Sequence, residues 1–404
     1  MTAHGNPANL SGPFVPAGQR AALVIDVDAI AGNVARLTEV AGPAQVMAVV
    51  KADAYGHGLL PSARAARAGG ATWLGVALLE EALALRADGD VDPILAWLGV
   101  PGDAWSDAVA ANIDIGVSTL WQLDEIAPAA VTSGRPARIQ LKLDTGLSRN
   151  GATVAEWPEL VGKVAALQAE GVVDVVGIWS HFVLADSPSS DTVAQQLRVF
   201  DEGVEFARTQ GVTPQLRHIA NSAATFALPH ARYELVRPGI AVYGLSPGGE
   251  VGPARELGIR PAMTLAARLA HAKQVPAGQG VSYGHEYVTT TAANLGLVPL
   301  GYADGIPRRA GNVGPLLGAG ARRVIAGRVC MDQFVVDFGS DGIAAGDEVV
   351  LFGDGDAPTA DDWAVATGTI NYEIVTRVGP RVPRRYVGTA GVDRTVGGSR
   401  GAVD

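Results

Sequence analysis

Short apolar runs rich in Val, Ile and Leu alternate with longer stretches of helical period between residues 21 and 255. The candidate strands are residues 46–50, 74–78, 94–98, 113–117, 139–143, 175–179, 216–219 and 233–236. Helical stretches separate most of them, for example at 80–87, 119–126, 159–170 and 192–209. Apolar strands joined by helices indicate a parallel sheet that is covered on its outside. Eight such strands predict an α/β fold with a (β/α)8 barrel of the TIM type, and a doubly wound open sheet is the alternative.

The pattern changes after residue 260, where helical stretches thin out. Segments of period two at 295–300, 323–329, 334–338 and 348–352 are separated by Gly and Pro. This predicts a mostly β C-terminal domain. We expect a flexible leader at 1–20, the barrel at 21–257, the β domain at 258–387 and a flexible tail at 388–404.

Composition narrows the classes of function. The 31 Lys and Arg against 41 Asp and Glu give a net charge of −10, which argues against nucleic acid or an anionic membrane as a partner. The single cysteine, Cys330, excludes an intrachain disulfide. We expect a soluble, cytoplasmic protein without a membrane span. No metal site is predicted, because His285-Glu286 lacks a second histidine four residues later.

Polar side chains follow four of the predicted strands directly. Lys51 follows 46–50, His181 follows 175–179, Asn221 and Ser222 follow 216–219, and Arg237 follows 233–236. In a barrel these positions meet at the face that carries active sites, although any one of them could simply end its strand. A lysine there is partly desolvated, which lowers the pKa of its amine and suits it to Schiff-base formation.

The loops after the last two strands suit a phosphate group. Barrels commonly bind phosphate there through backbone N–H groups and hydroxyls, and this chain has Asn221-Ser222 and Gly239-Ile240 at these places. A Schiff-base lysine together with a phosphate pocket is what pyridoxal 5'-phosphate requires.

The segment Lys51-Ala-Asp-Ala-Tyr55-Gly-His-Gly resembles the cofactor-lysine motif of the alanine racemases. These are pyridoxal-phosphate enzymes of fold type III, with a barrel and a β C-terminal domain. Further matches in family order are Lys142-Leu-Asp-Thr-Gly-Leu-Ser-Arg149, His218-Ile-Ala-Asn-Ser222, Arg237-Pro-Gly-Ile240, Val281-Ser-Tyr283-Gly, Gly301-Tyr302-Ala-Asp-Gly, Cys330-Met331-Asp332-Gln and Ile370-Asn-Tyr372-Glu. The resemblance covers most of the chain, from about residue 21 to residue 386.

The resemblance implies a set of cofactor-binding residues. Lys51 would form the Schiff base, and Arg237 would face the pyridine nitrogen with His218 behind it. His181 would pack beside the ring, Arg149 would point towards the 3'-oxygen, and Lys142 would be a position open to carbamylation. The implied phosphate loops and contacts are Tyr55, Asn221, Ser222, Gly239, Ile240 and Tyr372.

The resemblance also implies a homodimer with shared active sites. Tyr283 would be the second catalytic base, opposite Lys51. Tyr302, Met331 and Asp332 would form the entrance and the pocket for the substrate carboxylate. In the family these four residues come from the partner subunit.

The function implied is interconversion of L-alanine and D-alanine by two-base proton transfer, which supplies D-alanine for peptidoglycan. Proton removal from one face and return on the other needs an acid/base group on each side of the cofactor. A broader racemase that also takes serine is the nearest alternative, because a pocket discriminates one extra atom only weakly. A non-catalytic pyridoxal-phosphate-binding relative and an amino-acid decarboxylase are more distant ones. Ile306 and the pair Leu147-Ser148 depart from the commonest family pattern.

Overall fold

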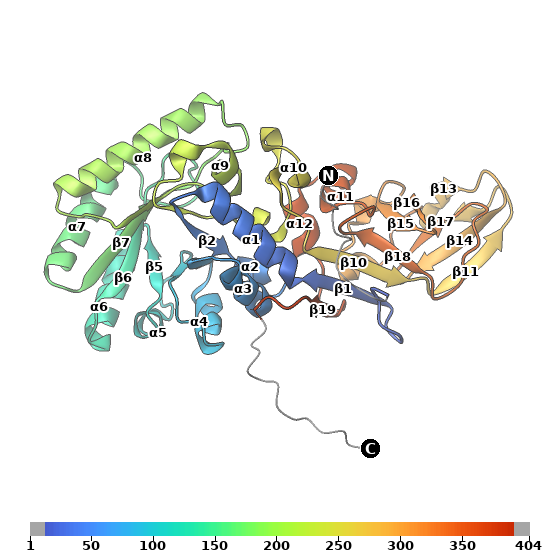
Figure 1. Cartoon of the computed structure of the whole chain (residues 1–404), viewed down its shortest axis with the longest axis horizontal. Helices are drawn as coiled ribbons and strands as arrows, with labels where there is room; N and C mark the ends of the chain where they lie inside the picture. Colours follow the sequence, from blue (N-terminus) through green and yellow to red (C-terminus); the bar gives the residue numbers. More distant parts are fainter. Residues whose placement is uncertain (1–12, 392–404) are drawn as a thin grey trace, which may run out of the picture.

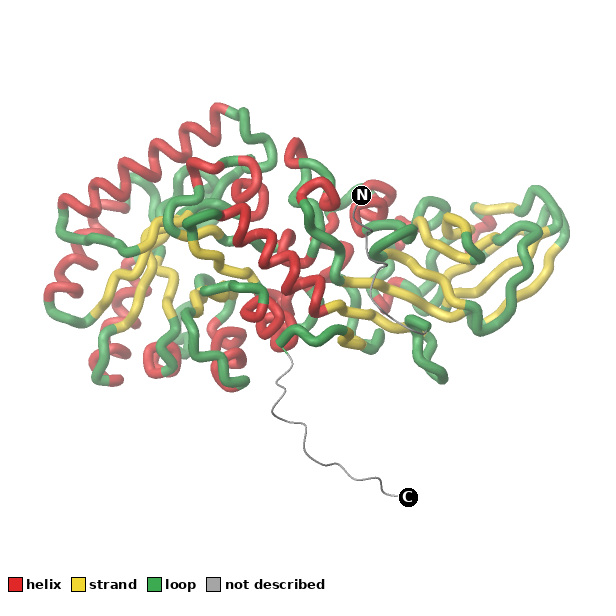
Figure 2. The backbone as a smooth tube through the Cα atoms, viewed as in Figure 1, coloured by secondary structure: helices red, strands yellow, loops and turns green. Residues whose placement is uncertain are grey.

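The computed structural model describes residues 13–391. A barrel wrapped in helices lies on one side of Figure 1 and a strand-rich domain on the other. Figure 2 shows the same division, with yellow strands enclosed by red helices in one half and yellow strands dominating the other. Among the described residues, no helix combines the length and apolarity needed to cross a bilayer.

The barrel has eight parallel strands in the order β8-β7-β6-β5-β4-β3-β2-β9. They are β2 (Gln45–Val49), β3 (Trp73–Val76), β4 (Ile94–Ala96), β5 (Asp114–Val117), β6 (Ala137–Lys142), β7 (Val173–Trp179), β8 (Leu216–His218) and β9 (Leu235–Val236). Each matches one predicted strand to within a few residues, so the predicted barrel is confirmed and the open doubly wound sheet is wrong. Between β8 and β9 the ring is closed by Arg237 N donating to Ala220 O at 2.8 Å.

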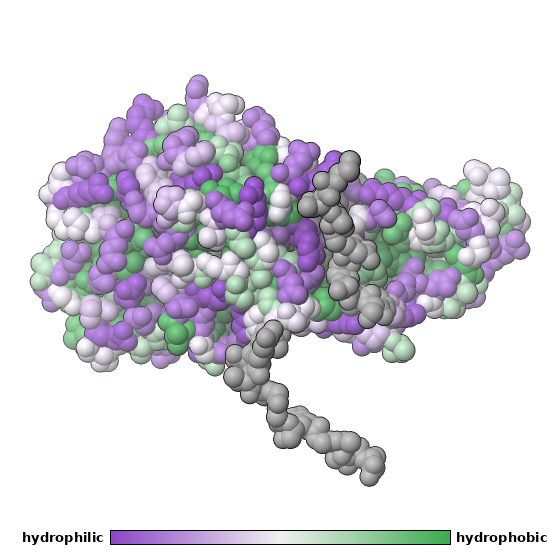
Figure 3. All heavy atoms as spheres, in the orientation of Figure 1, coloured by the Kyte–Doolittle hydropathy of each residue, from purple (hydrophilic) through white to green (hydrophobic). Residues whose placement is uncertain are grey.

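Helices follow the strands and cover the outside of the barrel. The barrel half of the chain contains α1 (Val27–Ala41), α2 (Lys51–Tyr55), α3 (Leu59–Ala68), α4 (Leu79–Ala87), α5 (Trp105–Ala110), α6 (Leu120–Ser133), α7 (Trp157–Ala169), α8 (Asp191–Thr209), α9 (Ser222–Ala227) and α10 (Ala254–Leu257). It also contains the 3-10 turns η1 (Pro229–Ala231), η2 (Ile240–Tyr243) and η3 (Gly249–Val251). Hydrophilic side chains are spread over the outer face of these helices in Figure 3, as a helix packed by one face onto a sheet requires.

The interior of the barrel is apolar on one side and polar on the other. An apolar cluster is contributed by β2, β3, β4, β7, β8 and β9 through Met47, Trp73, Leu95, Val176, Leu216 and Leu235. Strands β5 and β6 instead contribute Asp114 and Gln140, both fully buried. Buried polar groups of this kind need hydrogen-bond partners. Gln140 donates to Asp114 and contacts His218, which lies at the carboxyl end of β8.

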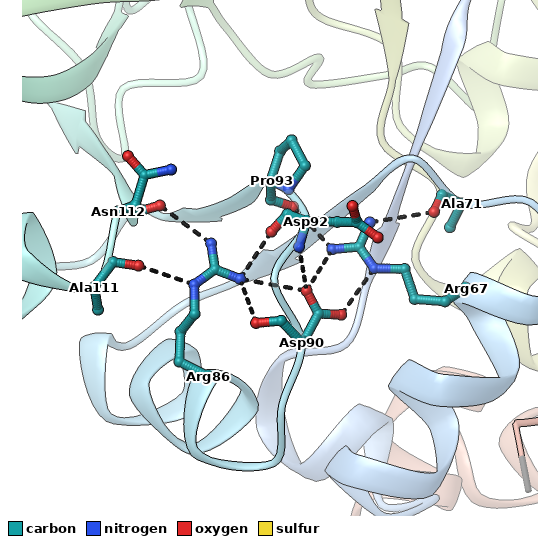
Figure 4. Close-up of polar contacts among 8 residues, drawn as sticks. All are labelled: Arg67, Ala71, Arg86, Asp90, Asp92, Pro93, Ala111 and Asn112. Atoms are coloured by element: carbon teal, nitrogen blue, oxygen red, sulfur yellow. Dashed lines mark hydrogen bonds and ion pairs between the residues drawn. The ribbon is translucent and has the colours of Figure 1, made fainter. Parts of the chain in front are cut away.

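Loops at the amino ends of β3, β4 and β5 are held together by one carboxylate and two arginines (Figure 4). Arg67 Nε and Nη2 donate to Asp90 at 2.9 and 3.0 Å, and Arg86 Nη1 donates to the same carboxylate at 3.3 Å. Arg86 also donates to the backbone oxygens of Ala111 and Asn112, at 2.9 and 3.1 Å. These contacts fix the end of the barrel opposite to the polar strand ends.

The second domain is built on a nine-stranded sheet in the order β11-β14-β17-β16-β15-β18-β10-β1-β19. Its strands are β1 (Ala21–Asp26), β10 (Met263–Arg268), β11 (His271–Val275), β14 (Ala293–Val298), β15 (Pro315–Gly318), β16 (Ala321–Ala326), β17 (Phe334–Asp337), β18 (Glu348–Phe352) and β19 (Arg384–Val387), and β12 (Gly280–Val281) pairs with β13 (Tyr287–Val288). The same domain contains η4 (Tyr283–His285), η5 (Tyr302–Asp304), η6 (Arg308–Ala310), α11 (Ala360–Thr367) and α12 (Asn371–Thr376). The mostly β character expected after residue 260 is confirmed.

Strand β1 lies in this sheet and not in the barrel. It pairs antiparallel with β10 and parallel with β19. The first strand of the segment that we expected to form the barrel thus belongs to the sheet of the β domain. The predicted boundary between residues 257 and 258 stays a prediction.

The described ends of the chain are packed against the fold. Val15 is fully buried, and its backbone N donates to the Glu348 carboxylate at 2.9 Å. The flexible leader expected at 1–20 stays a prediction: Val15 makes these contacts, and residues 1–12 lie outside the described part of the chain. At the other end, Thr389 and Ala390 both donate their backbone N–H to Asp28 Oδ1, and the rest of the expected tail, 392–404, also lies outside it.

Candidate active site

A cavity of about 400 Å³ lies at the carboxyl ends of the barrel strands. It brings together all eleven barrel and α12 residues that were expected to line the pocket, namely Lys51, Tyr55, Lys142, Arg149, His181, Asn221, Ser222, Arg237, Gly239, Ile240 and Tyr372. These residues come from the carboxyl ends of β2, β6, β7, β8 and β9 and from the β domain, because α12 with its Tyr372 lines one side of the cavity.

Lys51 begins a left-handed turn directly after β2. Residues 52–55 all have φ between 53° and 55°, and none is glycine. This conformation costs non-glycine residues roughly 1–2 kcal/mol each, so the surrounding structure must hold it. The turn directs both Lys51 and Tyr55 into the cavity, although they are only four positions apart.

Two carboxylates hold that turn in place. Glu81 Oε1 accepts from the backbone N of Ala52 at 2.6 Å, and Asp53 Oδ1 accepts from the backbone N of Leu59 at 2.8 Å. Glu81 is fixed in its turn by the backbone N–H groups at the start of α4. The strained turn is therefore anchored to the next strand–helix unit of the barrel.

The two lysines in the cavity have lowered pKa values. Burial, and then the nearby Arg149, lower the pKa of Lys51, while Glu81 opposes them. Burial, Arg237 and Arg149 lower the pKa of Lys142 to about 7, and its ammonium lies 4.3 Å from the ring centroid of Trp179. Both amines therefore have easier access to the neutral, nucleophilic form than an exposed lysine does.

Hydroxyls gather at the corner of the cavity between Tyr55 and Gly239. Ser222 Oγ accepts from the backbone N of Gly239 at 2.8 Å, and the rings of Tyr55 and Tyr372 lie 6.0 Å apart. Burial raises the pKa of Tyr55 above its ordinary value and that of Tyr372 to about 12, so both phenols stay protonated donors. This is a donor set that suits an anion such as phosphate. Asn221 lines the same wall and caps α9 by accepting from Ala224 N at 3.0 Å.

Arg237 is held from behind by the barrel. Its Nη1 lies 2.9 Å from Nδ1 of His218, and its Nη2 donates to Ser180 O at 2.7 Å. Burial lowers the pKa of Arg237 to about 9, which leaves the guanidinium protonated at neutral pH. His181 Nδ1 lies 3.4 Å from Nη2 of Arg237, and burial together with Arg237 lowers the pKa of His181. The site thus contains a fixed cation between two neutral imidazoles.

Four expected site residues lie elsewhere, in the β domain. Tyr283, Tyr302, Met331 and Asp332 are all exposed, Tyr283 by 70%, and none lines the cavity formed by residues 13–391 of this chain. Tyr302 N donates to Cys330 O at 3.1 Å, which places η5 beside Met331, and Asp332 pairs with Arg381 at 2.8 Å. Among the described residues, no group of His, Cys, Asp and Glu could hold a metal ion.

Comparisons with known proteins give the family. The model of the N-terminal domain of alanine racemase matches residues 25–247, and that of its C-terminal domain matches residues 262–386. The alanine racemase of Frankia casuarinae is 58% identical over 376 residues, which is 92% of this chain and 98% of the relative. The chain belongs to the alanine racemase family. Like its relatives, this racemase is a pyridoxal-phosphate-dependent isomerase that interconverts L- and D-alanine.

Solved racemases have the same architecture. The alanine racemase of the D-cycloserine producer Streptomyces lavendulae matches with a TM-score of 0.91 at 55% identity, covering 92% of this chain and 98% of that one. The Bacillus anthracis alanine racemase with bound L-Ala-P matches with a TM-score of 0.83 at 35% identity, covering 93% and 97%.

The cavity of this racemase fits pyridoxal phosphate in its donor chemistry. The amine of Lys51, with its lowered pKa, suits the aldehyde of the cofactor. The buried guanidinium of Arg237 suits the ring nitrogen, and the protonated hydroxyls suit the phosphate. Gly239 is part of the fit, because a Cβ there would lie 2.3 Å from the hydroxyl oxygen of Tyr55. Trp179 adds a buried indole N–H without a partner among the described residues.

Sequence reasoning missed five residues of the racemase cavity: Val49, Ala52, Trp97, Trp179 and Thr376. Trp97 follows β4 and Trp179 ends β7, and their ring centroids lie 5.9 Å apart across the barrel mouth although β5 and β6 separate the two strands. A tryptophan in an apolar strand looks like ordinary core from sequence. The signal available for Trp179 was its place two residues before His181, at the end of a strand.

Proposed function

We propose that Lys51 and Tyr283 are the two catalytic bases of this racemase, and that they come from different subunits of a homodimer. The observation that carries the proposal is the separation described above: the amine lines the cavity, and the phenol is exposed on the β domain of the same chain. A second copy that covers the cavity would bury Tyr283, Tyr302, Met331 and Asp332 at its entrance.

The residues divide the proton transfer between two faces. The cofactor supplies an aldehyde that joins the substrate amine and a ring that withdraws electrons from the α-carbon. Lys51, whose lowered pKa favours the neutral amine, would take or return the proton on one face of the α-carbon. Tyr283 of the second copy does so on the other face, and exchange of roles between the two reverses the configuration.

The remaining side chains orient the reacting groups. The phosphate would be held by Tyr55, Ser222, Gly239, Ile240 and Tyr372, with Asn221 in the same wall. Arg237, backed by His218, keeps its own protons and therefore does not protonate the pyridine nitrogen. Arg149 would orient the substrate and the 3'-oxygen, with Lys142 beside it, and Met331 and Asp332 of the partner would bound the substrate pocket. His181 would pack on the ring.

Two broader statements belong to the same proposal. The enzyme works in the cytoplasm, to which the single cysteine is suited, since reducing compartments do not favour disulfides. Its D-alanine would serve peptidoglycan synthesis.

Subunit complementation tests the shared site. Lys51→Ala and Tyr283→Phe chains, each inactive alone, are mixed, allowed to exchange subunits and assayed for conversion of L-alanine to D-alanine. Mixed dimers would carry one site with both bases, so up to about half of the wild-type activity per mixed dimer is expected. Mixed dimers that are verified by affinity tags and remain inactive would contradict the proposal, and Tyr287→Phe, on the neighbouring β13, provides a matched control for the phenol.

A further inference from the structure

A chain of buried hydrogen bonds crosses the barrel from Arg237 to its opposite end. His218 Nε2 lies 2.7 Å from Gln140 Oε1, and Gln140 Nε2 donates to Asp114 Oδ2 at 2.7 Å. Asp114 Oδ1 accepts from Arg138 Nε at 2.6 Å. Asp114, Gln140 and His218 are all fully buried, so water does not compete for these bonds.

The barrel backbone makes room for this chain at Gln140. The register between β6 and β7 shifts there: Ile139 is opposite Val175, whereas Gln140 is opposite Gly177. The extra residue of this bulge is Val176 in β7, and it brings Gly177 opposite Gln140. A Cβ on Gly177 would lie 3.2 Å from Gln140 Oε1, so only glycine leaves the amide its full space.

The carboxylate gives the chain a direction. Asp114 accepts from Arg138, and a carboxylate can only accept, so the amide nitrogen of Gln140 faces it and the amide oxygen faces His218. The proton of the neutral imidazole must then be on Nε2. Nδ1 of His218 is left with a lone pair, which accepts from Nη1 of Arg237.

We propose that Asp114 and Gln140 are positioning residues, which act through the tautomer of His218 to fix how Arg237 presents its N–H groups to the cofactor. Neither residue lines the cavity. With Nη1 held by His218 and Nη2 held by Ser180 O, the guanidinium is fixed in one orientation at the wall of the cavity that it lines.

The substitution Asp114→Asn tests the proposed direction of the hydrogen bonds. It replaces an acceptor by a donor and so reverses donors and acceptors along the series, while the side chain keeps its shape. The new amide keeps its oxygen towards Arg138, so its NH₂ group faces Gln140. The Gln140 amide then turns over, the imidazole proton of His218 moves to Nδ1, and there it opposes an N–H of Arg237. Asp174→Asn is the matched control, since Asp174 also faces Arg138, at 3.7 Å, but is half-exposed and outside the chain.

Two readouts other than activity follow the effect. The first is the ¹⁵N spectrum of histidine-labelled protein, with the His218 resonances assigned from their loss in His218→Asn. We expect the Nε2–H tautomer in the wild-type holoenzyme and in Asp174→Asn, and the Nδ1–H tautomer in Asp114→Asn. The second is the dissociation constant of pyridoxal phosphate, titrated into stripped protein, which should rise at least about tenfold in Asp114→Asn alone.

Gln140→Met separates this role from a purely structural one. The methionine cannot turn over, so Asp114→Asn should cause no further loss of cofactor affinity in the Gln140→Met background. Equal losses in both backgrounds, or an unchanged His218 tautomer in Asp114→Asn, would overturn the proposal. If the Asp114→Asn protein does not fold, the wild-type spectrum alone decides. A proton on Nδ1 of His218, or on both of its ring nitrogens, would be incompatible with the proposal.

Discussion

The hydroxyl of Tyr55 occupies the space that a Cβ on Gly239 would need, with only 2.3 Å between the two positions. Gly239→Ala should therefore displace Tyr55 from the phosphate corner and weaken binding of pyridoxal phosphate by at least about tenfold. Equilibrium titration of the stripped enzyme measures this. Gly162→Ala is the control, because a Cβ there meets nothing within 4 Å and the helix α7 should tolerate it. Wild-type affinity in Gly239→Ala would contradict the assignment.

Lys142 should make stability depend on pH. Burial and then Arg237 lower its pKa to about 7 from 10.5, so between these values the folded chain binds fewer protons than the unfolded chain. The contribution of this group to the free energy of unfolding therefore rises with pH across that window, by up to about 1.4 kcal/mol per pH unit. Urea unfolding of the stripped enzyme in CO₂-free buffer measures the slope. Lys142→Met should flatten it, and equal slopes in both proteins would refute the prediction.

The same amine should react with carbon dioxide. Near neutral pH a large share of Lys142 is in its neutral form, which is the form that adds to CO₂. We expect a carbamate ¹³C resonance in labelled bicarbonate that disappears in Lys142→Met and persists in Lys163→Met, a half-exposed lysine on α7. A resonance that survives in Lys142→Met would assign the carbamate to another amine.

Tyr283→Phe should affect the two enantiomers unequally. If the phenol serves one face of the α-carbon, its loss should slow deuterium exchange from L-alanine more than from D-alanine, by about a hundredfold or more in rate. Lys51, on the other face, still exchanges the D-enantiomer. Proton NMR in deuterated buffer follows both substrates, and equal slowing of the two would remove the one-sided role.

The carboxylate of Asp90 should matter for stability and not for chemistry. It accepts from Arg67 and Arg86, both mostly buried, and Asp90→Asn leaves one of these N–H groups facing an amide NH₂. We expect a loss of about 1–3 kcal/mol in the free energy of unfolding, measured with urea, and unchanged cofactor affinity. Glu39→Gln, which breaks an exposed pair with Arg36, should change stability by less than about 0.5 kcal/mol.

The barrel could be predicted because its strands are buried on both faces and therefore read as unbroken apolar runs. The residues after these strands, such as Lys51 and Arg237, followed from the geometry of parallel strands, whose carboxyl ends meet. Strand β1 could not be placed, since its partners are in β10 and β19 at the far end of the chain, and local periodicity carries no information about such pairing. The left-handed turn at 52–55 was also invisible, because Ala and Tyr have no preference for that conformation.

The polar interior of the barrel was missed for a related reason. Gln140 and Asp114 lie inside apolar strands. A single polar residue in such a strand is ordinarily interpreted as pointing outwards, away from the barrel interior. Gln140 lies two positions before Lys142 and therefore on the same, inward face of β6, and the register shift places Gly177 beside its amide. The four β-domain residues Tyr283, Tyr302, Met331 and Asp332 are predicted from family resemblance alone, since nothing in their local sequence points to a cavity.

The position of β1 has a consequence for how the chain is made. The ribosome releases Ala21–Asp26 first, and both of its neighbours in the sheet, β10 and β19, only after the whole barrel has been synthesised. During synthesis the backbone N–H and C=O groups on both edges of β1 therefore stay unpaired while the barrel folds. A fragment that starts at residue 258 would lack the strand between its own β10 and β19, so its sheet would be incomplete without residues 21–26.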